Sequence, residues 1–246
     1  MTAEEFRKKL EENQEWAPGW EAIEGVFEKL YPDQEPSHYG TNMVARAMFG
    51  GECYLDGYSI YDSPNGYKHI VTFGMTELYA DEDALGGEWN NWGYEMTIKL
   101  PEKDNESCMW AIDLLSNLAY YTYTEKRFFE PFQYIAGGGG SINRDRDSQI
   151  TALMAVYDTE AQGVDTIYGR TDFIQLVGIT QRELELLMED RENARVLYER
   201  MRAENPYLVT DLNRTKSYLS LIHISGGPSG RHGVPDLRRH GGAAFL

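Results

Sequence analysis

The side chains of this sequence that could carry out chemistry are scattered acids. Two carboxyl groups in one cleft can act as the general acid and the general base of a hydrolase. Four acids are candidates for such a pair: Asp56, Glu77, Glu95 and Glu130. Their spacing does not pair any two of them, and solvated or capping carboxylates are far more common. We therefore predict a protein that is not an enzyme and has no catalytic residues, with a carboxylate-dependent hydrolase as the alternative.

Metal and phosphate sites have as little support in the sequence. The histidines before the C-terminal region are His38 and His69, and the two cysteines are Cys53 and Cys108. None of them has the CxxC or HxxH spacing of a metal site, so we predict no metal ligands and no cofactor. The glycine-rich run 137–141 lacks the following helix and the nearby lysine of a phosphate-binding loop. This pattern favours a flexible loop.

The charge balance restricts the class of partner. Forty acidic residues against 23 basic ones give a formal net charge of -17. Such a surface repels phosphates, so we predict no nucleic-acid partner. It attracts a basic protein, such as a basic toxin domain, although solubility alone explains the charge equally simply. The sequence shows neither a signal peptide nor an apolar run long enough to span a membrane. We therefore expect a cytoplasmic protein with free thiols and no membrane contact.

Aromatic side chains are the most unusual feature of the sequence. It contains 17 tyrosines, and one short span is especially rich in aromatic residues: Tyr120, Tyr121, Tyr123, Phe128, Phe129, Phe132 and Tyr134. Tyrosine combines apolar area with a hydroxyl group that tolerates solvent, which suits a groove for a partner. Packing in the core is the more common role of any single tyrosine. As a cluster, however, these residues favour partner binding over catalysis.

Hydrophobic periodicity predicts the elements that position these side chains. Apolar residues recur at helical spacing in 20–30, 109–123 and 181–203, and Thr180 with Glu183 has the pattern of a capping box before the last of these helices. Residues 92–100 alternate apolar and polar side chains, which indicates a half-buried antiparallel strand. Shorter strands are predicted at 41–49, 55–61, 67–75, 128–135, 149–157, 164–168, 171–177 and 207–210.

These elements predict a single α+β domain, with a mainly antiparallel sheet and helices packed against it, because no regular βαβ alternation or repeat is present. We expect this domain at residues 16–215. Residues 1–15 alternate acids and bases, which predicts a solvated helical segment. Residues 219–246 are rich in Gly, Arg and His, and 219–225 looks like the translation of a transposon end used in sequencing libraries. We expect this tail to be disordered or non-native.

Several motifs of the domain resemble those of the Suppressor of fused family. VTFGMTELY at 71–79 is similar to the family's strand ending in G-x-[ST]-[DE]-L-Y, and GYEMTIKL at 93–100 is similar to its strand G-[FY]-E-[LM]-T-[FI]-[RK]-L. TDFIQLVGIT at 171–180 resembles the strand and turn F-L-Q-I-V-G-[LV]-T. Further matches, in the order of the family, lie at 30–34, 50–51, 55–61, 114–121 and 208–212. The resemblance covers residues 16 to 215.

The resemblance implies a non-enzymatic domain that binds a protein or a peptide. In animals the family restrains Hedgehog signalling by clamping a peptide of Gli transcription factors, which adds a strand to the sheet of the domain. The animal proteins have a second domain, for which this chain is too short. The chain therefore looks like the compact bacterial members, to which an immunity role against polymorphic toxins is ascribed. A homodimeric scaffold subunit with an aromatic interface is a further alternative.

The resemblance also implies two contact residues. Tyr121 falls where the animal proteins have a tyrosine that contacts the peptide. Twelve residues later those proteins place an aspartate that meets the peptide, whereas this chain has Gln133. An amide lacks the charge of that contact, so Gli-type specificity is not expected. Together with the aromatic cluster, this gives the predicted partner-binding residues: Tyr121, Tyr123, Phe129, Gln133 and Tyr134.

Overall fold

The computed structural model of this chain describes residues 1–41, 55–219 and 244–245. The strand predicted at 41–49 falls almost entirely outside the described residues, as do Cys53 and most of the tail predicted at 219–246. Of that tail, Leu219 is buried and Ala244–Phe245 forms a short strand. The boundaries of the predicted domain and tail therefore stay predictions.

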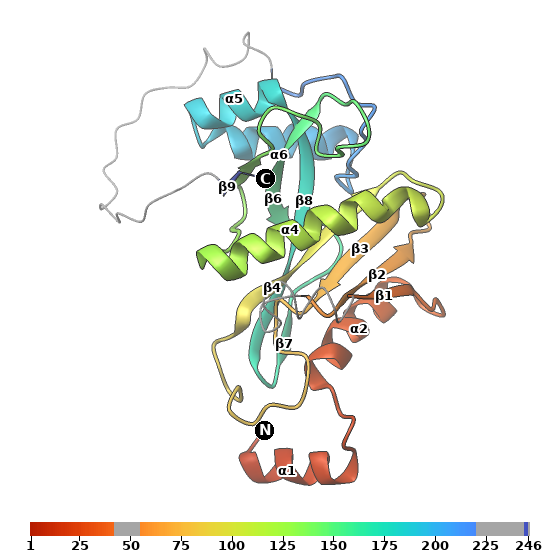
Figure 1. Ribbon diagram of the computed structural model, residues 1–246, viewed down its shortest axis with the longest axis vertical. Coiled ribbons are helices and arrows are strands. Elements are labelled where there is room, and N and C mark those ends of the chain that lie inside the picture. Colours follow the sequence, from red (N-terminus) through yellow and green to blue (C-terminus); the bar gives the residue numbers. More distant parts are fainter. Residues whose placement is uncertain (42–54, 220–243, 246) are drawn as a thin grey trace, which may run out of the picture.

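The centre of the fold is one sheet, which contains nine strands within the described residues (Figure 1). In chain order they are β1 (Ser37–Gly40), β2 (Gly57–Asp62), β3 (Lys68–Phe73), β4 (Trp89–Leu100), β5 (Tyr134–Ala136), β6 (Ile150–Tyr157), β7 (Val164–Thr166), β8 (Gly169–Thr180) and β9 (Ala244–Phe245). Their order across the sheet is β1-β2-β3-β4-β8-β6-β5-β9, and β7 pairs with β8. All pairs are antiparallel except β4 with β8 and β5 with β9. The prediction of a mainly antiparallel α+β domain is confirmed.

The helices of the described residues lie around this sheet. They are α1 (Ala3–Glu12), α2 (Pro18–Leu30), α4 (Met109–Glu125), preceded by the 3-10 turn η1 (Glu106–Cys108), α5 (Gln181–Glu189) and α6 (Asn193–Glu204). The helices predicted at 20–30 and 109–123 are α2 and α4. Among the described helices, none is long and apolar enough to cross a membrane.

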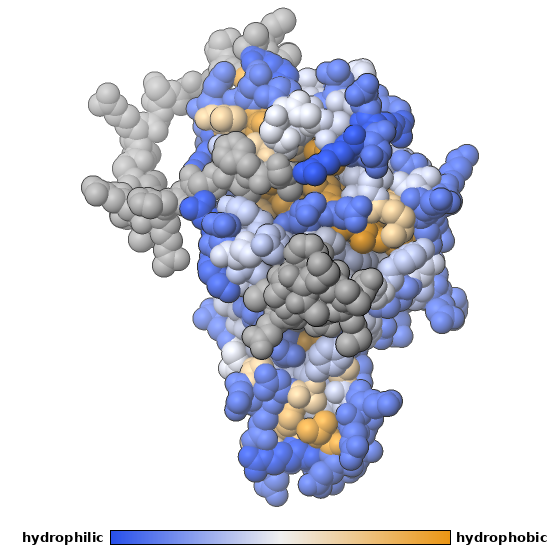
Figure 2. All heavy atoms as spheres, viewed as in Figure 1, coloured by the Kyte–Doolittle hydropathy of each residue, from blue (hydrophilic) through white to orange (hydrophobic). Residues whose placement is uncertain are grey.

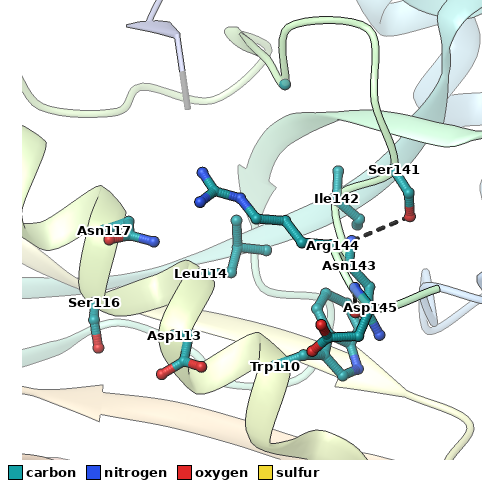
Figure 3. A pocket seen from close by; sticks show the side chains of 11 residues that line it. Trp110, Asp113, Leu114, Ser116, Asn117, Ser141, Ile142, Asn143, Arg144 and Asp145 are labelled. Atoms are coloured by element: carbon teal, nitrogen blue, oxygen red, sulfur yellow. Dashed lines mark hydrogen bonds between the residues drawn. The ribbon is translucent and has the colours of Figure 1, made fainter.

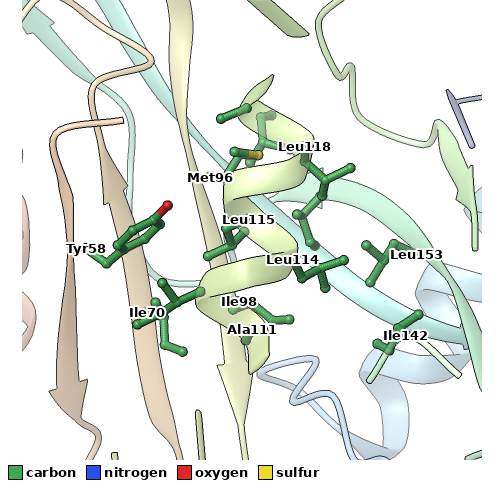
Figure 4. Packing of buried hydrophobic residues seen from close by; sticks show 14 of the residues in the cluster. Tyr58, Ile70, Met96, Ile98, Ala111, Leu114, Leu115, Leu118, Ile142 and Leu153 are labelled. Carbon is green, nitrogen blue, oxygen red and sulfur yellow. The ribbon is translucent and has the colours of Figure 1, made fainter. Parts of the chain in front are cut away.

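One face of the sheet packs against α4. Leu114, Leu115 and Leu118 recur at helical spacing, so they share the face of α4 that meets the sheet. Figure 4 shows these side chains over Met96 and Ile98 of β4, in a cluster that also includes residues of β2, β3 and β6. The loop that follows α4 leads to β5.

The opposite face of the sheet packs against α2. Successive side chains of a strand point to opposite faces, and on β3 Ile70 belongs to the α4 cluster whereas Val71 packs with Phe27 of α2. In α1, which begins with a capping box between Thr2 and Glu5, Phe6 is buried against Trp16. Both faces of the central strands are thus covered.

This double coverage corrects one prediction about β4. The alternation in 92–100 predicted a strand with one exposed face, but Glu95, Thr97 and Lys99 are buried as completely as their apolar neighbours. The cause is the second layer, because polar side chains of this face meet polar partners beneath α2 instead of water. β4 pairs antiparallel with β3, as predicted, and in parallel with β8, which the alternation did not predict.

Three other predictions differ from the structure near chain turns. The helix predicted at 181–203 is two helices, because the Asp190 carboxylate accepts a hydrogen bond from Glu192 N and turns the chain between them. The capping box that was predicted before it, at Thr180, is present. The strand predicted at 128–135 shrinks to β5, since Phe132 has a positive φ of 69°. The segment 207–210 is not a strand, and Leu208 there has φ 54°.

Candidate partner-binding site

The outer edge of β5 is the part of the fold best suited to accept a partner strand. On its inner side β5 pairs antiparallel with β6, with Ile135 opposite Leu153. On its outer side its described neighbour is β9, whose two residues pair in parallel with Ile135 and Ala136. A segment distant in the sequence thus lies along this edge as a strand. The edge therefore has the geometry for strand addition, and a partner strand would take the place of β9.

The hydrogen bonds of β5 show which of its backbone groups face outward. Gly137 N donates to a carbonyl of β6 at 3.2 Å, and Gln133 O accepts from an amide of β6 at 2.9 Å. In an antiparallel pair the backbone groups of successive residues face opposite edges. The groups of Tyr134 and Ala136 therefore point away from β6, toward an added strand.

A polar pocket of about 430 Å³ lies just beyond the end of β5, between α4 and the loop 137–145. Figure 3 shows Asp113 and Asn117 on α4, with Arg144 reaching from the loop toward the helix. The loop is held in part by its own turns, in which Ser141 Oγ accepts from Asn143 N at 3.2 Å. This polar pocket presents both charges and amide groups next to one end of β5.

A second pocket, of about 560 Å³, lies at the other end of β5 and is here called the α6 pocket. Its lining includes Gln133 and Tyr134 on one side and Arg191 and Arg195 on the other. The Arg195 guanidinium lies 4.6 Å from the centre of the Phe132 ring, a cation–π distance. A strand added along β5 would therefore have the polar pocket at one end and the α6 pocket at the other.

A third pocket, of about 470 Å³, adjoins the α6 pocket and is here called the aromatic pocket. The two share Glu130, Pro131 and Tyr157. The aromatic pocket also has carboxylates from Glu130 and Asp172. Its aromatic side chains come from three places, namely the first half of β4, the loop after α4 and the end of β6. They are Trp89, Trp92, Tyr94, Phe128, Phe129 and Tyr157.

The structure brings two of the predicted aromatic contacts together and places a third in the core. Tyr121 stacks on Phe129, with ring centres 6.2 Å apart and planes 17° apart, and Phe129 lines the aromatic pocket. Tyr123 is only 9% exposed, and its hydroxyl donates to Gly74 O at 2.6 Å. Its ring meets Trp92 edge to face. Tyr123 therefore supports the pocket from behind.

The other two predicted residues lie at β5. Gln133 Nε2 donates to Glu130 Oε2 at 2.9 Å, and its Oε1 accepts from Glu130 N at 3.2 Å. Tyr134 is the first residue of β5 and is partly buried against α6. Both line the α6 pocket. Gln133 is thus half-exposed beside the strand edge, where its side chain also holds the turn before β5.

Sequence reasoning missed most of the aromatic pocket, including Trp89, Tyr157 and Asp172. Trp89 and Tyr157 are 51% and 57% exposed, and Asp172 lies between them on β8. These residues come from β4, β6 and β8, and they become neighbours because β8 pairs with β4 on one side and with β6 on the other. No local pattern could have grouped them. The sequence gives only one hint of this pocket, which is that large aromatic residues stand at the ends of predicted strands.

The buried carboxylate of Glu95 is held by a nest of donors. Its Oε1 accepts from Gly74 N, Thr76 N and Thr76 Oγ1, and its Oε2 accepts from Thr72 Oγ1 at 2.6 Å and Met75 N. Burial raises the pKa of Glu95 to about 7, although these hydrogen bonds act to lower it. Glu95 therefore fixes the turn after β3.

A second buried carboxylate, Asp158, lies in an ionic network beneath α2. It contacts His69 Nε2 at 2.9 Å and Lys99 Nζ at 3.0 Å, and Lys99 Nζ also lies 2.9 Å from Glu160. Tyr31 O–H bonds to the other ring nitrogen of His69 at 2.8 Å. All but Glu160 are buried. The network joins α2, β3 and β4 to the loop after β6.

Neither buried carboxylate supports the hydrolase alternative. As far as the described residues show, Glu95 and Asp158 line none of the three pockets near β5. Of the four acids named as candidates, Glu130 is the one found in these pockets, so no two of them meet there. The described part of the chain also has no cluster of three or more His, Cys, Asp or Glu that could hold a metal.

Comparison with known proteins gives one family. The model of the family described as Suppressor of fused protein (SUFU) matches residues 51–215. Among curated proteins, the chain is 28% identical over 220 residues to the Suppressor of fused homolog of Homo sapiens and equally to that of Mus musculus. Each match covers 82% of this chain and 44% of the relative. The chain thus spans less than half the length of these relatives.

Solved structures share the fold. The chain superposes with a TM-score of 0.70 and 24% identity on a structure described as the Sufu–Fu complex, covering 82% of this chain and 93% of that one. For Drosophila Suppressor of Fused the TM-score is 0.70 with 25% identity, over 82% and 51% of the two chains. A SUFU homolog from Neisseria gonorrhoeae gives a TM-score of 0.54 with 15% identity, over 82% and 97%.

Proposed function

This chain belongs to the Suppressor of fused family, and from that premise we propose that it is a non-enzymatic domain that binds a protein or peptide by adding a partner strand to β5. The observation that carries the proposal is the outer edge of β5. On this edge β5 already pairs with β9, a strand from a distant part of the chain, and a pocket lies at each end of β5. A relative with this fold has been solved as the Sufu–Fu complex, which also supports a binding role.

We propose further that the partner is basic and that binding takes place in the cytoplasm. The formal net charge is -17, and hydrophilic residues cover most of the face shown in Figure 2. Charge of one sign increases the rate at which a partner of the opposite sign associates, and salt screens this effect. Neutralisation of a basic toxin domain is the form of this role that the resemblance to compact bacterial members favours. Gln133 and Tyr134 are the predicted contacts that lie beside the strand edge.

A backbone substitution in β5 tests strand addition. Peptides that bind the full chain would first be selected from a displayed random library. Their affinity for the wild type, Ala136→Pro and Ala136→Ser would then be measured by calorimetry. Proline removes the outward N–H of Ala136, and its ring occupies the place of the added strand, so we expect a loss of affinity of at least about tenfold. Serine keeps the N–H and should bind as the wild type does.

Two outcomes of this experiment would contradict the proposal. Equal affinity of the proline and serine variants, both folded by circular dichroism, would show that the peptide binds elsewhere. Affinity that does not fall with added salt would argue against a basic partner, while leaving strand addition intact.

A further inference from the structure

The aromatic pocket has more exposed ring surface than a folded core requires. Trp89, Phe128 and Tyr157 are 51%, 49% and 57% exposed, and all three line the pocket. Trp92 and Phe129 line it as well. Large aromatic side chains that stay exposed together indicate a recognition surface more often than a packing defect. The pocket is therefore a candidate for one side chain of a partner.

Two carboxylates give this pocket a charge preference. Glu130 Oε2 accepts from Gln133, and Asp172 Oδ1 accepts from Arg170 Nε at 2.8 Å. Among the described contacts, the second oxygen of each carboxylate has no hydrogen bond. A carboxylate can accept several hydrogen bonds at once. Both acids can therefore still accept from a cation in the pocket.

Cations of the chain itself already pack on rings of this surface. Lys126 Nζ lies 5.8 Å from the centre of the Trp92 ring, and Arg195 lies 4.6 Å from that of Phe132 in the adjoining pocket. These distances lie within the range of cation–π attraction, which is strongest for tryptophan. The rings near β5 thus present faces that attract positive charge, next to carboxylates that do the same.

We propose that the aromatic pocket binds an arginine side chain of the partner. The planar guanidinium group stacks on rings and donates in pairs to carboxylates, which suits this pocket better than the compact ammonium of lysine. The inference rests on the proposed function, because it assigns a side-chain subsite to the same partner. Through Glu130 and Tyr157 the pocket adjoins the α6 pocket, so the arginine would lie just beyond the end of the strand added to β5.

Fluorine NMR of the full chain labelled with fluorotryptophan tests this assignment. The chain has five tryptophans, and Trp89→Phe identifies the resonance of Trp89. The probe is N-acetylarginine methylamide, and the neutral citrulline analogue is its control. We expect the Trp89 resonance to move saturably with the arginine probe at millimolar concentrations and to stay in place with citrulline. Glu130→Gln should weaken binding of the probe by about fivefold.

A matched variant and the peptide experiment separate the possible failures. Glu21→Gln removes one acid at an exposed position of α2, outside the described pockets, and should leave the affinity for the probe unchanged. No saturable shift of Trp89, or equal shifts with citrulline, would overturn the arginine subsite. If the selected peptides still bind Ala136→Pro more weakly than the wild type in that case, strand addition remains supported without the arginine subsite. If the arginine probe binds but the affinity of every selected peptide is the same for Ala136→Pro and the wild type, strand addition is rejected and the arginine subsite is kept.

Discussion

Replacing Asp158 with asparagine is expected to lower the free energy of unfolding by about 3 kcal/mol. Asp158 is the centre of the buried network, 3.0 Å from Lys99 Nζ and 2.9 Å from His69 Nε2. Asparagine removes its negative charge and turns an amide N–H₂ toward groups that donate. Lys99 is then left with Glu160 as its remaining anionic contact. Urea unfolding followed by circular dichroism measures the loss.

The same carboxylate gives the stability a pH dependence. Burial raises the pKa of Asp158, but the charge of His69, its hydrogen bond and the charge of Lys99 lower it more, so the pKa lies well below its ordinary value. The unfolded chain takes up this proton at about pH 4, and the folded chain does so only at lower pH. The stabilisation is therefore present above about pH 4 and decreases below it, so the difference between wild type and Asp158→Asn should shrink on acidification.

Asp165→Asn is the matched control for this substitution. Asp165 lies 3.4 Å from Arg170, but its side chain is 84% exposed. Loss of an exposed ion pair changes the unfolding free energy by less than about 1 kcal/mol. Equal effects of the two substitutions would show that the buried network contributes no more than a surface pair.

Replacing Gly19 with alanine is expected to lower the free energy of unfolding by about 3 kcal/mol. A Cβ atom at Gly19 would lie 1.9 Å from Glu77 O and 2.8 Å from Leu78 Cα. Both atoms belong to the backbone, so no side chain can rotate away. Gly19 N also donates to Leu78 O at 3.0 Å, a contact that the displaced helix would lose. Thermal and urea unfolding measure the effect.

Gly25 of the same helix provides a control of opposite sign. A Cβ atom there would have nothing within 4 Å. Alanine favours the helix over glycine, so Gly25→Ala should raise the unfolding free energy by about 0.5–1 kcal/mol. If Gly19→Ala were as stable as Gly25→Ala, the close approach of α2 to the turn at Glu77 would not exist in solution.

The sequence was sufficient to predict those parts of the fold that repeat over many residues. The spacing of Leu114 and Leu118 predicts α4, and the alternation around Met96 predicts β4, because long periodic segments bury one face whatever their context. The short strand β5 was predicted too long, since the left-handed conformation of Phe132 follows from its tertiary setting. The burial of Glu95 was missed for a similar reason: its partners come from the end of β3 and from the turn that follows β3.

The candidate site was predictable in part. The aromatic span and the resemblance led to Phe129, Gln133 and Tyr134, which the structure places at the pockets around β5. The same span included Tyr123, because sequence distinguishes poorly between a tyrosine in a groove and one whose hydroxyl bonds to the backbone in the core. Trp89 could not be added, since only the parallel pairing of β4 and β8 brings it to this surface.

Amide hydrogen exchange along β5, measured by NMR with and without a selected peptide, is the most direct test of strand addition. We predict that the outward amide of Ala136 exchanges more slowly in the complex, because the added strand replaces the two-residue strand β9 and pairs with a longer stretch of β5. Exchange at Ala136 that does not change while amides of another surface become protected would contradict the account and move the binding site away from β5.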